Sequence, residues 1–211
     1  MMLIKTVLTF SLLAGAVWAQ KWELGAIGGA GFSPDLTLQS AAGSAATGLK
    51  TGPVAGVYVG ADSSSHWGGE IRYLYRWSDL KLSSGNTNVD FGGHTHILHF
   101  DFLRYLQPEG ARARVFGAFG AGVKVLTGTG MESAAQPLAK FAALTATREN
   151  LALGDVGAGV KFDLSPHARA RVEMRDYISP TPSKVIAAAP GVTIGGVLND
   201  IQVLGSIGYT W

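Results

Sequence analysis

Hydrophobic and polar residues alternate along residues 67–77, which read Trp-Gly-Gly-Glu-Ile-Arg-Tyr-Leu-Tyr-Arg-Trp. One face is mostly aromatic or aliphatic and consists of Trp67, Gly69, Ile71, Tyr73, Tyr75 and Trp77. The other face consists of Gly68, Glu70, Arg72, Leu74 and Arg76. A period of two residues predicts a β-strand. A soluble sheet could bury the apolar face, but a strand of about 9–11 residues with aromatic residues at both ends is typical of a membrane barrel.

The same alternation recurs along the chain and divides it into eight predicted strands. They cover residues 20–32, 53–61, 67–77, 94–106, 113–126, 151–163, 168–178 and 198–211. The connections between them are alternately long and short, and Pro108 and Gly110 in one short connection favour a tight turn. The long connection at residues 127–150 is rich in alanine, and we expect a short helix at residues 139–146.

This order of connections predicts an all-β fold: an eight-stranded antiparallel up-and-down transmembrane β-barrel with short periplasmic turns and long outer loops. A sheet in lipid must close on itself, because its backbone groups cannot pair with water there. An even number of strands places both ends of the chain on the periplasmic side of the barrel, and aromatic residues then gather at two levels, as in aromatic girdles. The predicted girdle residues are Trp22, Phe32, Trp67, Trp77, Tyr209 and Trp211.

The opposite faces of the strands predict a charged interior. Eight strands enclose a space that side chains can fill, and the inward positions carry both signs of charge, as expected for pairing. The predicted lumen network consists of Glu70, Arg72, Arg76, Asp101, Lys124, Lys161, Arg171, Glu173 and Arg175. Glu23, Arg114, Asp155 and Asp200 share the inward parity. We therefore expect a largely plugged lumen, and the alternative is a path for ions or small solutes.

Two charged residues, Arg104 and Asp176, share parity with the lipid-facing positions. Arg104 lies beside a predicted periplasmic turn, from which its side chain can extend to the lipid headgroups. For Asp176 we expect either a place near the outer rim or a β-bulge that shifts the register.

Residues 1–19 have the pattern of a signal peptide. Lys5 supplies a positive charge, residues 6–16 form an apolar run, and Val17-Trp18-Ala19 offers a cleavage site before Gln20. The apolar run is too short to span a membrane as a helix, and no later run reaches roughly 18–20 apolar residues. The predicted organisation is a signal peptide at residues 1–19 and a barrel at residues 20–211, exported to a bacterial outer membrane.

Composition excludes several classes of protein. The net charge of the 211 residues is only +2, which gives no case for a nucleic-acid partner. The chain contains no cysteine, which excludes disulfides and thiolate metal sites. His94 and His96 share a face at a metal-ligand spacing, but two ligands are a weak signal, so we predict no metal site and no cofactor.

Short segments resemble OmpA-like outer-membrane β-barrel domains. Residues 157–167, which run into residues 171–177, are similar to the hairpin of the sixth and seventh strands of these domains, and residues 115–124 resemble their fifth strand. The ending Ile207-Gly208-Tyr209-Thr210-Trp211 is similar to the C-terminal signal that the outer-membrane assembly machinery recognises, with Trp in place of the commoner Phe. The resemblance implies a stand-alone membrane barrel and assigns Ile207, Tyr209 and Trp211 to the assembly signal. We expect the barrel to be a monomer.

The function of the predicted barrel leaves alternatives open. A lipid A-modifying enzyme would need a serine beside a histidine at the outer rim, and no motif joins Ser133 to His94 or His96, while Ser65-His66 lies in a predicted periplasmic turn. We therefore predict no catalytic residues. A soluble lipocalin-like barrel would invert the two faces of the strands, and the aromatic girdles argue against it.

The third and fourth long connections are unusually apolar. Their apolar residues are Leu138, Phe141, Leu144, Val185, Ile186, Val192 and Ile194. Such residues mark either a surface that binds a ligand or a lid over the barrel mouth, and we favour the lid. The sequence as a whole predicts a structural or adhesive role at the cell surface, with outer-membrane lipids as partners.

Overall fold

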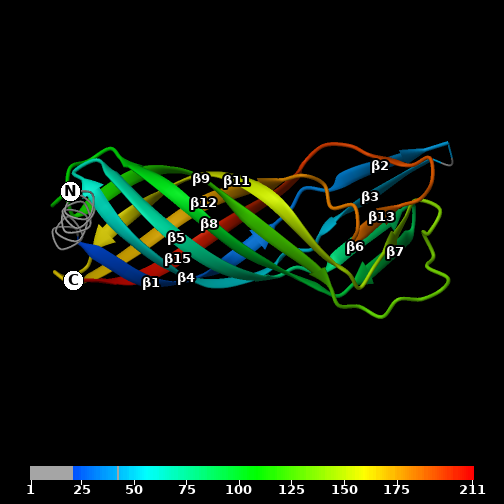
Figure 1. Ribbon diagram of the computed structural model, residues 1–211, viewed down its shortest axis with the longest axis horizontal. Coiled ribbons are helices and arrows are strands. Elements are labelled where there is room, and N and C mark those ends of the chain that lie inside the picture. The colour runs from blue at the N-terminus through cyan, green and yellow to red at the C-terminus, as the bar shows by residue number, and fades with distance from the viewer. Residues whose placement is uncertain (1–20, 42) are drawn as a thin grey trace, which may run out of the picture.

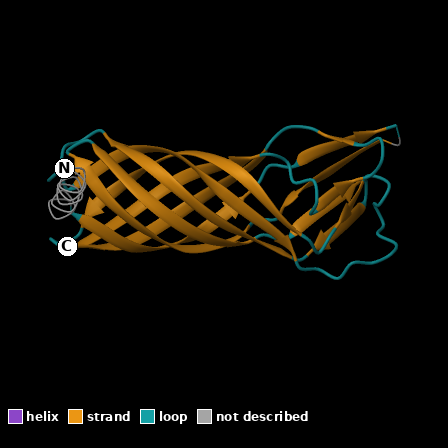
Figure 2. Cartoon of the chain, viewed as in Figure 1, coloured by secondary structure: helices purple, strands orange, loops and turns teal. Residues whose placement is uncertain are grey.

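The computed structural model describes residues 21–41 and 43–211, so the predicted signal peptide lies outside the described residues. Eight antiparallel strands close into a barrel in the order β1-β15-β12-β11-β9-β8-β5-β4 (Figures 1 and 2), which confirms the predicted fold. The barrel strands are β1 (Trp22–Phe32), β4 (Gly52–Ser64), β5 (Trp67–Trp77), β8 (Gly93–Tyr105), β9 (Ala113–Gly128), β11 (Arg148–Asp163), β12 (Ala168–Ser179) and β15 (Leu198–Thr210). No helix in the described part of the chain is long and apolar enough to cross a membrane.

The barrel exposes its apolar residues and buries its charged ones. Leu24 and Val172 on the outside are 53% and 58% exposed, whereas Arg72 and Arg175 on the inside are fully buried. This distribution is the reverse of a soluble protein, in which charged residues are almost never fully buried unless they are paired. The predicted inward and outward faces therefore correspond to the two surfaces of the barrel wall, and the lipocalin-like alternative with an apolar interior is excluded.

Closure of the barrel joins its first and last strands. Residues of β1 pair with residues of β15 from Glu23 opposite Thr210 to Phe32 opposite Ile201. The short connections and the beginning of β1 lie at the same end as the C-terminus, which we call the turn end. There the Trp211 backbone N–H donates to the Trp22 carbonyl at 3.2 Å.

The long connections build a second layer of β-structure at the opposite end, which we call the cap (Figure 2). One sheet of the cap has the order β14-β2-β3-β6-β7, and β10 pairs separately with β13. The cap strands are β2 (Leu36–Ser40), β3 (Gly43–Leu49), β6 (Leu80–Ser84), β7 (Thr87–Phe91), β10 (Ala142–Leu144), β13 (Ile186–Ala188) and β14 (Thr193–Ile194). These connections are the long outer loops expected from the sequence, and they carry paired β-structure that the polarity pattern did not predict.

The cap has an apolar core of its own. Leu38, Leu80, Phe141 and Ile186 come from four different connections and pack in one buried cluster. The cluster continues onto the barrel through residues such as Leu126 of β9. The apolar residues of the third and fourth connections thus lie inside the cap, as the lid interpretation expects, and do not form an exposed patch.

The local prediction of a short helix is wrong. Residues 139–146 form no helix, because residues 142–144 pair as β10 with β13 and their backbone groups are used in that ladder. Asp176 lies near the outer end of β12, which is the first of the two places expected for it, and the register of β12 with both neighbours is continuous there. Its carboxylate accepts a hydrogen bond from Asn199 at 2.7 Å. The register shift within the described barrel lies between Asp62 and Ser64.

Candidate functional site: the charged lumen

The residues of the predicted lumen network all lie inside the barrel and are buried. They are Glu70, Arg72, Arg76, Asp101, Lys124, Lys161, Arg171, Glu173 and Arg175. Strand alternation places every second side chain in the interior, so these residues meet although they are distant in sequence. The ion pairs among them and their neighbours form three levels along the barrel axis.

The central level is built around two arginines. Arg175 lies 3.0 Å from Glu70, 2.9 Å from Asp101 and 3.0 Å from Glu173. Arg72 lies 2.7 Å from Glu70 and 2.6 Å from Glu173. The two guanidinium groups therefore share carboxylates, and the planar fork of arginine suits such multiple pairing.

The level nearest the cap is centred on Arg76. Its guanidinium pairs with Asp200 and also donates to the carbonyls of Gly31, at 3.0 Å, and Lys50, at 2.9 Å. Lys124 approaches the same Asp200 carboxylate at 3.6 Å. Arg76 thus ties the barrel wall to the base of the first long connection.

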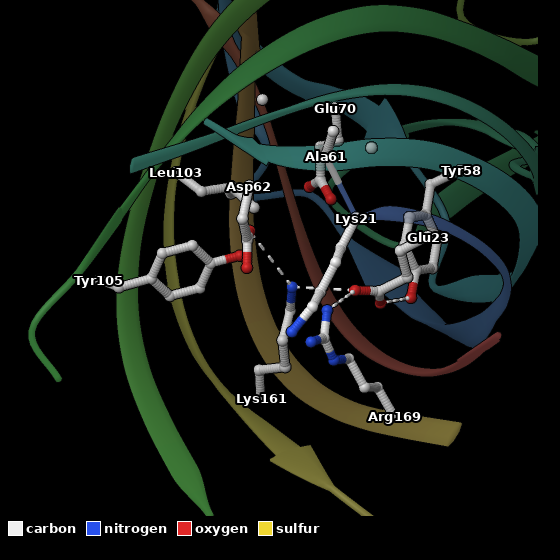
Figure 3. Close-up of a pocket in the computed structure, with 12 residues that line it drawn as sticks. Lys21, Glu23, Tyr58, Ala61, Asp62, Glu70, Leu103, Tyr105, Lys161 and Arg169 are labelled. Carbon is white, nitrogen blue, oxygen red and sulfur yellow. Dashed lines mark hydrogen bonds and ion pairs between the residues drawn. The ribbon is translucent and has the colours of Figure 1, made fainter. Parts of the chain in front are cut away.

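The level nearest the turn end is centred on Glu23. Its carboxylate accepts from Lys161 at 3.0 Å, from Arg169 at 3.2 Å and from the Tyr58 hydroxyl (Figure 3). A cavity of about 10 Å³ lies among these side chains and Tyr105, which is room for about one water molecule. Arg114 stacks over the Tyr105 ring at 3.6 Å and reinforces this end of the lumen.

The closed barrel, its exposed apolar wall and its charged interior have counterparts among known proteins. The family described as outer membrane protein beta-barrel domain matches residues 6–210. The chain belongs to this outer-membrane β-barrel family. The barrel accordingly lies in the outer membrane of a Gram-negative cell, with the turn end in the periplasm and the cap outside. Its family is consistent with a structural or surface role.

Solved outer-membrane barrels share the fold at low sequence identity. Neisserial surface protein A is 7% identical with a TM-score of 0.55, and the match covers 90% of this chain and 97% of that one. OprG from Pseudomonas aeruginosa is 12% identical with a TM-score of 0.52, and the match covers 90% and 95% of the two chains. No curated protein matches this outer-membrane barrel in sequence. The structural similarities therefore describe the fold alone.

The predicted girdle residues lie at the two ends of this outer-membrane barrel. Trp67, Tyr209 and Trp211 are exposed at the periplasmic end, where Trp22 also lies, and Phe32 and Trp77 are exposed at the outer end. Ile207 and Tyr209 of the proposed assembly signal face outward on the last strand, and Trp211, directly after it, is exposed as well. Indole and phenol rings at these levels suit the boundary between lipid and water.

Arg104 also faces outward at the periplasmic end. Its guanidinium lies 5.0 Å from the centre of the Trp67 ring and donates to the His66 carbonyl at 3.3 Å. An arginine on the lipid-facing surface is thus held at the membrane boundary by its neighbours, as snorkelling requires.

The cap is fastened to the barrel by Glu149 of β11. Its carboxylate accepts hydrogen bonds from the backbone N–H groups of Ser183 at 3.0 Å, Lys184 at 2.8 Å and Val185 at 3.3 Å. Burial alone would raise the pKa of Glu149, but these N–H donors outweigh it and hold the pKa below its usual range. The fourth outer loop is therefore docked through an ionised carboxylate.

The structure also places the histidines and serines considered as chemical candidates. His94 and His96 face outward at the outer rim, and Ser133 lies exposed in the third outer loop, where it forms hydrogen bonds with backbone groups of Ala135. The Ser65 hydroxyl lies 3.0 Å from His66 in a periplasmic turn. Neither arrangement puts a serine, a histidine and an acid together within the described residues.

One titratable cluster was not predicted from the sequence. His99 lies 2.8 Å from Asp101 and 3.5 Å from Asp155, in a spacing that could suit a metal ion. The Arg175 guanidinium already pairs with Asp101 at 2.9 Å and with Asp155 at 3.0 Å. It thus supplies the positive charge that a metal ion would otherwise provide. The inward parity of these residues was visible in the sequence, but their meeting across non-adjacent strands was not.

Proposed function

We propose that this protein is a closed outer-membrane barrel that carries a rigid β-structured cap at the cell surface, and that its role is structural or in surface interaction. The observation that carries the proposal is the stack of ion-paired levels centred on Glu23, on Arg72 with Arg175, and on Arg76. Each level fills the lumen with long side chains held by partners on other strands.

Energetics favour a lumen that stays closed. A charge inside the barrel that loses its partner costs about 3–5 kcal/mol, so a path opened by swinging one arginine aside is expensive. The cap adds a second barrier, since its apolar core spans connections from several parts of the chain. Both features support a barrel that does not conduct ions or small solutes.

The arrangement of side chains at the outer rim supports a non-catalytic role. Hydrolysis by a barrel enzyme needs a nucleophile within hydrogen-bond reach of a base at the membrane boundary. The rim histidines His94 and His96 contact aromatic rings and each other instead. We propose that the barrel has no catalytic site, no cofactor and no metal centre, and that it works as a monomer whose last strand is recognised by the assembly machinery.

The proposal is tested by ion flux through liposomes that contain the refolded protein. The wild type is expected to leave the leak of the liposomes unchanged. The control variant is Lys50→Ala/Asp90→Ala. It removes an exposed ion pair outside the lumen without changing the net charge of the protein, and it should also leave the leak unchanged. A reproducible, protein-dependent flux through the wild type would contradict the proposal, provided that heat-modified mobility in electrophoresis shows the barrel to be folded.

A further inference from the structure

A groove of about 570 Å³ lies on the outer surface of the barrel, across the outer parts of β5, β8, β9 and β11. Strand pairing sets His94, Thr127 and Arg148 side by side at its outer end. Further along the same strands, toward the membrane centre, the groove is lined by Leu98, Val123 and Val125. The groove is therefore polar at one end and apolar at the other.

The two imidazoles in the groove are held in place by neighbouring rings. The Tyr73 hydroxyl and His96 Nδ1 lie 2.7 Å apart. His94 stacks on Tyr75 with ring centres 5.4 Å apart, and the rings of His94 and His96 meet edge to face at 5.1 Å. Rings fixed in this way need little further ordering when a ligand binds.

The polar end of the groove carries positive charge without a matching acid. Arg148 is exposed and has no ion pair among the described residues. The acids near Arg148 have other partners. Glu149 points to the other side of the strand, where Ser183 and the next residues bind it. Glu132 accepts from the Ala146 backbone N–H at 2.6 Å, and Asp79 accepts from the Gly93 backbone N–H at 3.2 Å.

The next two strands around the barrel, β12 and β15, have a different character at the outer rim. Asp176 of β12 and Asn199 of β15 form a hydrogen-bonded pair there, at 2.7 Å. The basic end of the groove therefore does not continue onto β12 and β15.

We propose that this groove binds one phosphorylated glycolipid of the outer leaflet. Arg148 and the two imidazoles hold a phosphate of the headgroup, since guanidinium groups match the geometry of phosphate oxygens. An acyl chain lies along Leu98, Val123 and Val125, which face the hydrocarbon region. The position of the groove below the cap selects the outer leaflet, and the proposal depends on the place of the barrel in the outer membrane and not on whether its lumen conducts.

The test is native mass spectrometry of the refolded protein in detergent with added diphosphorylated lipid A or its phosphate-free form. The variant is His94→Gln/His96→Gln/Arg148→Gln. Its matched control is Arg104→Gln, which removes the same formal charge from the outward surface at the periplasmic end. Wild type and Arg104→Gln are expected to retain one phosphorylated lipid, and the triple variant to bind it about tenfold more weakly. The phosphate-free lipid should bind the wild type as weakly as the triple variant binds the phosphorylated form.

Two results would overturn the proposal. One is equal retention of the phosphorylated and phosphate-free lipids by the wild type, and the other is an equal loss of binding in Arg104→Gln and the triple variant. Heat-modified mobility shows whether each variant is folded. If the triple variant does not fold, Arg148→Gln is compared with Arg148→Lys; the proposal requires that the lysine variant, which keeps the positive charge, binds more tightly than the glutamine variant.

Discussion

Arg175 joins more of the lumen than its position in one strand suggests. Its guanidinium contacts four carboxylates, those of Glu70, Asp101, Asp155 and Glu173, at 2.9 to 3.0 Å. All of these groups are buried inside the barrel. Replacement of Arg175 by methionine keeps a long side chain but leaves the four carboxylates with one cation fewer.

The expected loss of stability is large. Removal of one partner from a buried ion pair costs about 3–5 kcal/mol, because the other charge stays buried without compensation. Arg72 still contacts Glu70 and Glu173 in the variant, so we expect Arg175→Met to lower the free energy of unfolding by about 4 kcal/mol. Neutralising one carboxylate at the same time, in Arg175→Met/Asp155→Asn, should restore about 1–2 kcal/mol through the coupling of neighbouring sites.

The assay is urea unfolding of the refolded barrel in detergent, followed by tryptophan fluorescence. Arg104→Met is the control, because this exposed arginine lies outside the lumen and should change the stability by less than about 0.5 kcal/mol. The reasoning would be refuted if Arg175→Met lost no more stability than Arg104→Met. It would also be refuted if the loss of stability in Arg175→Met/Asp155→Asn equalled the sum of the losses in Arg175→Met and Asp155→Asn measured separately. The two residues would then be energetically uncoupled.

Four further predictions concern other parts of the molecule. Gly120→Ala should lose about 1–3 kcal/mol in the same assay, because an added Cβ would collide with the backbone and carboxylates of the lumen, whereas Gly117→Ala on the same strand meets open space and should be neutral. The contribution of Glu149 is present at neutral pH and is lost as the pH falls through its lowered pKa, so proteolysis of the fourth outer loop should increase in acid for the wild type and be fast at all pH values in Glu149→Gln. Phe141→Ala should destabilise the cap by about 3–5 kcal/mol and expose it to protease while the barrel keeps its heat-modified mobility. Trp211→Ser should lower the amount of folded protein in the outer membrane of cells without lowering refolding in detergent; equal losses in both would contradict a role in assembly.

The barrel was predictable because its signal is local. In each wall strand, residues that face lipid and residues that face the lumen alternate with a period of two, and the strand from Trp67 to Trp77 was predicted with the bounds that the structure has. The ends of other strands were not predicted correctly. The pairing of β9 and β11 continues beyond the apolar pattern, as far as Gly128 and Arg148. There the strands leave the lipid, and alternation of polarity no longer marks them.

The cap was not predicted because its strands pair across distant loops. Leu80 and Leu82 alternate with polar residues, but a pattern of this length is too short to identify a strand without its partners. The helix expected at residues 139–146 rested on alanine, and the pairing of Leu144 with Ile186 overrides that local preference. Tertiary contacts between loops decide this region.

The members of the lumen network followed from strand parity, but their partners did not. Asp155 meets both Arg175 and His99, which lie on different strands, because strand register and tilt bring the three side chains to one level. A shift of two residues in one strand would keep every side chain inside and change every partner. The sequence therefore predicts a charged interior, but it does not predict which charged side chains pair with each other.

Single-channel recording in planar bilayers tests the closed lumen most directly. The wild type, refolded and shown to be heat-modifiable, should add no discrete current steps at any applied voltage that the bilayer tolerates. Stable and reproducible steps that depend on the protein would contradict the account, and the ion pairs of Arg72, Arg76 and Arg175 would then have to be regarded as the lining of an ion path.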